Sequence, residues 1–223
     1  MRPRFRVPSA CLQALMACFL LASPLLLSGC WLFAADERMR GKEVVAEYLG
    51  LADKSVAIVV YVEPATLNEF PDAREEVSAH IARQMRENMP TTRLLDPKDV
   101  IHWQDETINW VGLSEKDIGK HFGVDRVLMV EVLDYSTRMK DGYSDLQGNI
   151  RATAKVFEVD TAESVPSWTG SFDVRWPKDG PVDTDRVNEV VVRMRTLQSF
   201  SEKVVNCFYT HREVDKPIRT REE

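Results

Sequence analysis

The stretch SVAIVVYVE, Ser55 to Glu63, is the most strand-like segment of the chain. Apolar and mostly β-branched side chains fill both of its alternating faces, which is typical of a strand covered on both sides. A second segment of this kind, VDRVLMVEVLD, runs from Val124 to Asp134. Because covered strands belong to sheets with helices on both faces, the two segments predict an α/β domain.

The residues between these strands predict alternating helices and a short strand. Pro64 and Pro71 bracket a loop, and a helix is expected over 71–89, where apolar residues recur every four positions before Pro90. A short strand is expected at 91–95 and a helix over 97–105, after Asp96 as N-cap. Another helix is expected from Ser114 to Gly123. The order β-α-β-α-β predicts parallel strands joined by right-handed crossovers.

The pattern changes after Asp134. Residues 150–156 and 168–176 alternate apolar and polar side chains, as antiparallel strands with one wet face do. A helix over about 183–209 carries a continuous apolar stripe, long enough to cross the sheet. The stripe consists of Val187, Val190, Val191, Met194, Leu197, Phe200, Val204, Val205 and Phe208. The predicted fold is a single α/β domain with a mixed sheet: a parallel β-α-β-α-β part, an antiparallel meander and a long C-terminal helix.

The amino terminus has the layout of a secretory signal. Three arginines, at positions 2, 4 and 6, precede an apolar run from Ala10 to Leu27. The ending Leu27-Ser28-Gly29-Cys30 resembles the lipobox of bacterial lipoproteins. That resemblance implies cleavage between Gly29 and Cys30 and acylation of Cys30, with fatty chains that hold the protein on a membrane. A retained anchor or an ordinary signal peptide is the alternative, since about 18 apolar residues lie at the lower limit for a span.

Cleavage would remove 29 of the 223 residues and three of the 29 basic residues. The remaining 194 residues would carry 26 basic and 35 acidic side chains, a net charge of −9. This balance argues against nucleic acid and against anionic lipid headgroups as partners, so the lipid on Cys30 would provide the membrane contact. Cys207 would be the one cysteine left besides Cys30, and its apolar neighbours predict a buried, inert thiol. The expected organisation is a signal peptide (1–29), a lipidated tether (30–53), the α/β domain (54–210) and a disordered tail (211–223).

Two motifs within the domain resemble a group of periplasmic lipoprotein domains. GVDRVLMVEV, Gly123 to Val132, places Gly-x-Asp before a strand that ends in Glu-Val, and AKVFEVDTAESVPSW, Ala154 to Trp168, runs through Asp-Thr into a hairpin with a tryptophan. The group includes the activators of penicillin-binding proteins and the periplasmic domain of the curli secretion channel. The resemblance covers about residues 54–210. It implies assembly or activation of a partner at the envelope, and it transfers no catalytic residue.

No catalytic motif is present in the sequence. The four histidines form no His-Glu-x-x-His pair, and neither a Gly-x-Ser-x-Gly elbow nor a phosphate-binding glycine loop occurs, so no metal or cofactor is expected. The candidate contact surface is the segment His102-Trp103 through Trp110-Val111. Its tryptophans are either a cover over the sheet or, together with His102, an anchor for a protein partner.

Three functions remain open at this level. The first is a membrane-anchored envelope lipoprotein that binds, assembles or activates a protein partner without catalysis of its own. The second is a tethered hydrolase in which His102 or His121 faces Asp125 or Glu131. The third is a purely structural envelope component. The expected location is the periplasmic face of the envelope. Trp31, the residue after the lipid cysteine, is not an aspartate, which by resemblance to lipoprotein sorting favours the outer membrane.

Overall fold

The computed structural model describes residues 41–138, 145–162 and 165–213. The chain divides into two compact units, one of residues 45–210 and one formed by the chain on either side of it. In the second unit, β1 (Lys42–Val44) pairs antiparallel with β8 (His211–Glu213). The predicted signal peptide and Cys30 lie outside the described residues.

The sheet of residues 45–210 is mixed, in the order β3-β2-β4-β5-β6, with β7 paired to β5. In its parallel part, β2 (Ser55–Val62) lies between β3 (Arg93–Leu94) and β4 (Arg126–Arg138). β5 (Asp145–Glu158), β6 (Trp168–Trp176) and β7 (Val182–Asp183) form the antiparallel part. The predicted fold class is therefore confirmed: a parallel β-α-β-α-β part, an antiparallel meander and a C-terminal helix.

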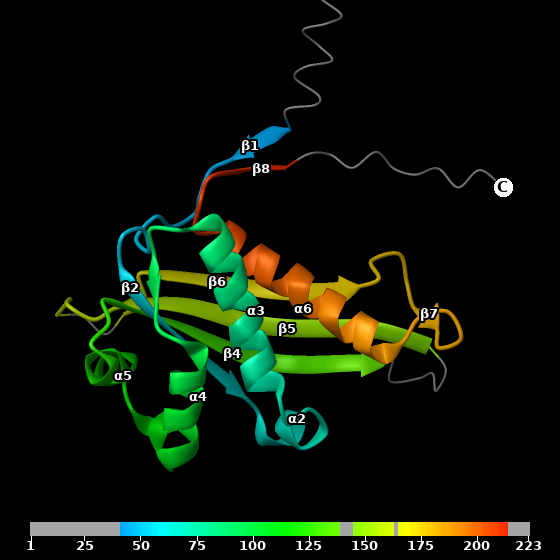
Figure 1. Ribbon diagram of the computed structural model, residues 1–223, viewed down its shortest axis with the longest axis horizontal. Coiled ribbons are helices and arrows are strands. Elements are labelled where there is room, and N and C mark those ends of the chain that lie inside the picture. The colour runs from blue at the N-terminus through cyan, green and yellow to red at the C-terminus, as the bar shows by residue number, and fades with distance from the viewer. Residues whose placement is uncertain (1–40, 139–144, 163–164, 214–223) are drawn as a thin grey trace, which may run out of the picture. The chain divides into compact units, whose positions relative to one another are not determined.

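Helices cover the two faces of this sheet unequally. On the first face, α3 (Ala73–Asn88) and α6 (Glu189–Asn206) lie side by side over the strands, as Figure 1 shows. The larger apolar core fills the space beneath them, with Ile58, Leu128, Ile150 and Phe200 among its fully buried members. On the second face, α4 (Pro97–Glu106), the 3-10 turn η1 (Trp110–Gly112) and α5 (Glu115–Phe122) enclose a smaller core over β2 and β4.

The helix ends follow the local sequence signals. The Asp96 side chain accepts a hydrogen bond from the Lys98 amide at the start of α4, and the Ser114 hydroxyl accepts one from the Asp117 amide at the start of α5. Gly123 ends α5 in the left-handed region, at φ 63°, which glycine adopts without a steric penalty. These caps were predicted correctly because they depend only on neighbouring residues.

Three predicted boundaries were wrong. The loop between Pro64 and Pro71 contains a short helix, α2 (Pro64–Glu69), since proline fits the first position of a helix. The tether predicted for residues 30–53 was too long, because Tyr48 packs against the larger core and Leu51 is fully buried in it. The tail predicted as disordered from residue 211 begins with strand β8, whose partner β1 lies more than 160 positions earlier.

A polar junction fixes the start of the parallel strands. Ser55 begins β2, and both its amide and its hydroxyl donate to Asp125 Oδ2, at 2.8 and 2.7 Å. The Asp125 amide donates in return to the Ser55 hydroxyl and backbone carbonyl. Arg93 of β3 lies 3.6 Å from the same carboxylate oxygen. The aspartate of the Gly-x-Asp motif thus ties β2 to the entry of β4 and reaches β3.

Replacing this carboxylate is expected to destabilise the domain in a pH-dependent way. The hydrogen bonds from Ser55 lower the pKa of Asp125, so the charged form stabilises the fold above the usual aspartate pKa. This stabilisation is lost as the pH falls through the lowered pKa. We expect Asp125→Asn to lower the melting temperature by several degrees at pH 7 and by less in strong acid. Asp179→Asn, in an exposed turn, is the control; equal melting temperatures for the two variants at pH 7 would contradict this role.

Candidate functional site

The two tryptophans of the predicted contact surface belong to the cover of the second face. Trp110 is only 8% exposed and packs with Ala57, Val59 and Ile118 in the smaller core. Trp103 is partly buried against that core, with its ring 5.1 Å from the Phe122 ring. The structure therefore places both in the cover, one of the two roles left open by the sequence. A partner contact through Trp103 or Trp110 stays a prediction.

His102 points away from this aromatic cluster. Its side chain is exposed, and its Nε2 lies 3.3 Å from Glu106 Oε1 one turn further along α4. His121 packs against the rings of both Trp103 and Phe122. The pairings named for a hydrolase are not formed among the described residues, because Asp125 bonds to Ser55 and Glu131 to Lys155. The described residues also contain no cluster of three or more side chains that could hold a metal ion.

Apolar side chains beside Trp110 are exposed. Ile108 is 93% exposed and Val111 61%, and both flank Trp110 in the chain. Leu113 follows η1 at 43%, and Leu133 of β4 is 50% exposed. These four residues come from the α4–α5 connection and from β4. Large aliphatic side chains exposed as a group, in contrast to isolated ones, mark interaction surfaces.

A hollow of about 300 Å³ is lined by Trp110 and by three of these residues, Val111, Leu113 and Leu133, and we call it the Trp110 hollow. Its apolar wall combines buried side chains with exposed ones, and its acidic residues are Glu63, Glu115 and Glu131. Glu131 pairs with Lys155 at 3.0 Å, while Glu63 and Glu115 have no ion pair within the described part of the chain. The full lining consists of Tyr61, Glu63, Trp110, Val111, Leu113, Glu115, Ile118, Met129, Glu131 and Leu133. The site can therefore accept an apolar group that also carries positive charge.

Leu133 lies in the hollow because it occupies the same face of β4 as Met129 and Glu131, at alternate positions of the strand. The pairing of β4 with β5 shifts register between Val132 and Asp134, which leaves Leu133 without an opposite residue. Pairing resumes at Asp134, which lies opposite Arg151 and whose carboxylate accepts a hydrogen bond from the Asn149 side-chain amide at 2.8 Å. Simple alternation in the sequence assigned Leu133 to a covered face. Sequence reasoning missed the exposure of this residue, because no local signal shows where the cover of this face ends.

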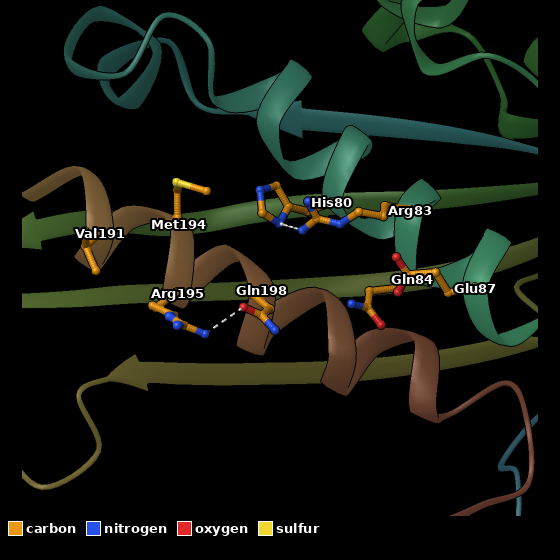
Figure 2. Close-up of a pocket in the computed structure, with 8 residues that line it drawn as sticks. All are labelled: His80, Arg83, Gln84, Glu87, Val191, Met194, Arg195 and Gln198. Carbon is orange, nitrogen blue, oxygen red and sulfur yellow. Dashed lines mark hydrogen bonds between the residues drawn. The ribbon is translucent and has the colours of Figure 1, made fainter.

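A second concave surface lies between α3 and α6 on the opposite layer. Figure 2 shows His80, Arg83, Gln84 and Glu87 of α3 facing Val191, Met194, Arg195 and Gln198 of α6. The space between these side chains has a volume of about 580 Å³, and we call it the α3–α6 groove. Burial, with a smaller effect of Arg83, lowers the pKa of His80 to about 4, so the imidazole is neutral at pH 7. Its Nδ1 lies 2.8 Å from Arg83 Nη2.

The first turns of α6 present both a buried and an exposed face, since Val192 and Thr196 are fully buried there. The helix begins at Glu189, after the N-cap Asn188, and not near 183 as predicted. Val190, Val191 and Met194 of the predicted stripe are exposed, whereas Leu197, Phe200 and Val204 are buried. The apolar stripe is therefore partly a core face and partly a surface.

Cys207 lies half-buried just after α6. Burial, and to a smaller extent the charge of Glu47, raises the pKa of its thiol to about 11. The thiol is therefore protonated at neutral pH, which makes it a poor nucleophile.

Known proteins offer only distant likenesses. No protein-family profile and no curated protein matches the chain. Similar solved structures include the lipoprotein GNA1162 from Neisseria meningitidis, at 17% identity over 68% of this chain and 98% of that one, with a TM-score of 0.44. A PelC dodecamer from Paraburkholderia phytofirmans matches at 15% identity over 75% of this chain and 95% of that one, with a TM-score of 0.44. A minor lipoprotein from Acinetobacter baumannii matches at 8% identity over 73% and 99%, with a TM-score of 0.37.

Two of these three structures are named lipoproteins, but at such TM-scores the likeness carries no argument about function or partners. The resemblance to activators of penicillin-binding proteins and to the curli secretion channel stays a prediction.

The division between core and surface in this region has a direct consequence for stability. We expect Trp110→Ala to lower the free energy of unfolding by about 3–5 kcal/mol, because it removes a large buried side chain. Ile108→Ala, two positions earlier but 93% exposed, should change it by no more than about 0.5 kcal/mol. Urea denaturation of both variants measures the difference. Similar losses for the two would contradict the division.

Proposed function

We propose that this protein is a membrane-anchored envelope lipoprotein that binds a protein partner through the Trp110 hollow and catalyses no reaction itself. The observation that supports this most directly is the group of exposed apolar side chains that line the hollow, Val111, Leu113 and Leu133, with exposed Ile108 two positions before Trp110 in the chain. Their exposure costs solubility unless a partner covers them. A concave surface with a rigid aromatic wall is the kind of place where interface hot spots form.

The chemistry of the hollow favours a partner segment of mixed character. Its wall is apolar, and Glu63 and Glu115 carry negative charges that no described residue neutralises. A segment with an aliphatic or aromatic residue next to lysine or arginine would satisfy both features, because the apolar group leaves water and the charges attract. An acidic protein with a net charge of −6 would also discourage acidic competitors from this surface.

The amino-terminal sequence supports the membrane part of the proposal. Acylation of Cys30 would hold the domain on the membrane by lipid chains, and more than one chain is needed for stable attachment. Among the described residues, no helix combines the length and apolar character that a membrane span needs. The proposed address is the periplasmic side of the envelope, on the outer membrane by the identity of Trp31.

The docking role can be tested by making the exposed apolar group polar. In cells treated with a crosslinker, we expect the double variant Ile108→Asp/Val111→Asp to lose its crosslinked partner about tenfold or more, because it places charges in the apolar contact. Val165→Asp, which changes a valine of 64% exposure away from the hollow, should retain the partner. Mass spectrometry of the captured proteins measures both. Equal capture by the two variants would refute docking at the hollow.

The membrane attachment has its own test. Cells supplied with labelled palmitate should incorporate label into the wild-type chain and not into Cys30→Ala, because the thiol is the proposed acylation site. Cys207→Ala, which keeps Cys30, should be labelled like the wild type. Label on the Cys30→Ala chain would place the lipid elsewhere and remove the basis for this form of anchoring.

A further inference from the structure

Two groups of exposed apolar residues lie on opposite sides of the sheet. Among the described residues, ten large apolar side chains are exposed, and seven of them fall into these groups. The first is the Ile108, Val111, Leu113 and Leu133 group at the Trp110 hollow, on the second face. The second is Val190, Val191 and Met194 on α6, beside the α3–α6 groove on the layer that covers the first face. Both groups are large enough to mark contact surfaces.

The charges that flank the two groups have opposite signs. Glu63 and Glu115 at the hollow lack a cationic partner within the described part of the chain. At the groove, Arg83 contacts the neutral His80 and Arg195 donates to the Gln198 amide oxygen at 3.3 Å. Neither arginine has a carboxylate partner among the described residues.

The arrangement within the groove strengthens this contrast. In Figure 2, Arg195 lies beside Met194 and Val191 on α6, Arg83 lies on α3 beyond His80, and Glu87 lies at the end of the groove away from Met194 and Val191. The one acidic residue of the lining therefore lies away from the apolar end. The groove presents aliphatic side chains together with the positive charges of Arg195 and Arg83, and the hollow presents aliphatic side chains with negative charges.

We propose that the chain docks onto a second copy of itself, with the α6 residues Val190, Val191 and Met194 of one copy covering the Trp110 hollow of the next. Arg83 and Arg195 then face Glu63 and Glu115 across the contact. The proposal rests on the proposed function, since it takes the hollow to be a protein-docking surface, and it names a protein that fits. Because the two surfaces differ and lie on opposite faces, the contact is heterologous and leaves each terminal copy with a free surface. Association can therefore continue beyond two copies.

Reversing the charges on each surface tests this pairing, and the self-association of the purified protein is the quantity measured. The full chain, purified in a nonionic detergent, is examined by sedimentation velocity over a range of concentrations at low and high salt. We expect concentration-dependent association that weakens as salt rises. The variants Arg83→Glu/Arg195→Glu and Glu63→Lys/Glu115→Lys should each weaken association about tenfold or more, because like charges then face one another.

The combination of all four substitutions provides the decisive result. Opposite charges face one another again in it, so the association constant should return to within about threefold of the wild type. Lys98→Glu/Lys178→Glu, which reverses two exposed charges outside both surfaces, should associate like the wild type. Melting temperatures equal to the wild type confirm that each variant is folded.

Several results would overturn the pairing. One is a wild-type chain that stays monomeric up to about 100 μM, a concentration at which even weak complexes form. Another is that the folded charge-reversal variants associate as strongly as the wild type. The third is that the variant with all four substitutions does not regain association. These results differ from a failure of the proposed function. If the wild-type chain is monomeric but Ile108→Asp/Val111→Asp still loses a different crosslinked protein, docking at the hollow stands and self-association falls.

Discussion

The junction between Ser55 and Asp125 is the constraint on which the rest of the domain depends. Three hydrogen bonds, two donated by backbone amides and one donated by the Ser55 hydroxyl to the Asp125 carboxylate, set β2 and β4 side by side at their starts. From this point the strands pair in parallel, Val56 with Arg126 through Val62 with Val132. Parallel neighbours require a crossover, and the crossover segments become the helices of both faces. One polar contact thus fixes the register of two strands that are otherwise apolar and could slide.

The unequal cover of the two faces explains where the candidate surfaces lie. On the first face, α3 and α6 span the sheet from β2 to β6, and the large core extends across β5. On the second face, the short helices cover β2, β4 and the end of β5 at Phe157, and the rest of β5 and β6 carries polar side chains such as Arg151, Thr153 and Thr169. The Trp110 hollow forms where this cover stops. It lies by the carboxyl end of β2, the end of a parallel strand at which α/β proteins commonly bind ligands.

Much of the fold could be predicted because its signals are local. The covered strands, the caps at Asp96 and Ser114 and the glycine at 123 each follow from a few adjacent residues. The β1–β8 pair could not be predicted, since its strands are three residues long and far apart in the chain. The start of α6 was placed too early for a different reason: an apolar stripe does not reveal where the core beneath it ends.

The sequence predicted which segment holds the candidate site but not which of its residues are exposed there. The sequence drew attention to the segment from His102 to Val111 because tryptophans are common in hot spots, yet the structure buries Trp110 and exposes its neighbours Ile108 and Val111. Leu133 joins them from β4 and Glu63 from the end of β2, and tertiary structure brings these residues together. The α3–α6 groove was missed entirely, because its two helices are about 110 residues apart in the chain.

The central claim is that the Trp110 hollow contacts a protein in the cell, and site-specific photo-crosslinking tests it most directly. A photoreactive amino acid placed at Val111 lies on the rim of the hollow, whereas one placed at Thr169 lies on the open polar face of β6. We expect a crosslinked protein of defined mass from position 111 and none from position 169. No adduct at position 111, or the same adducts from both positions, would contradict it.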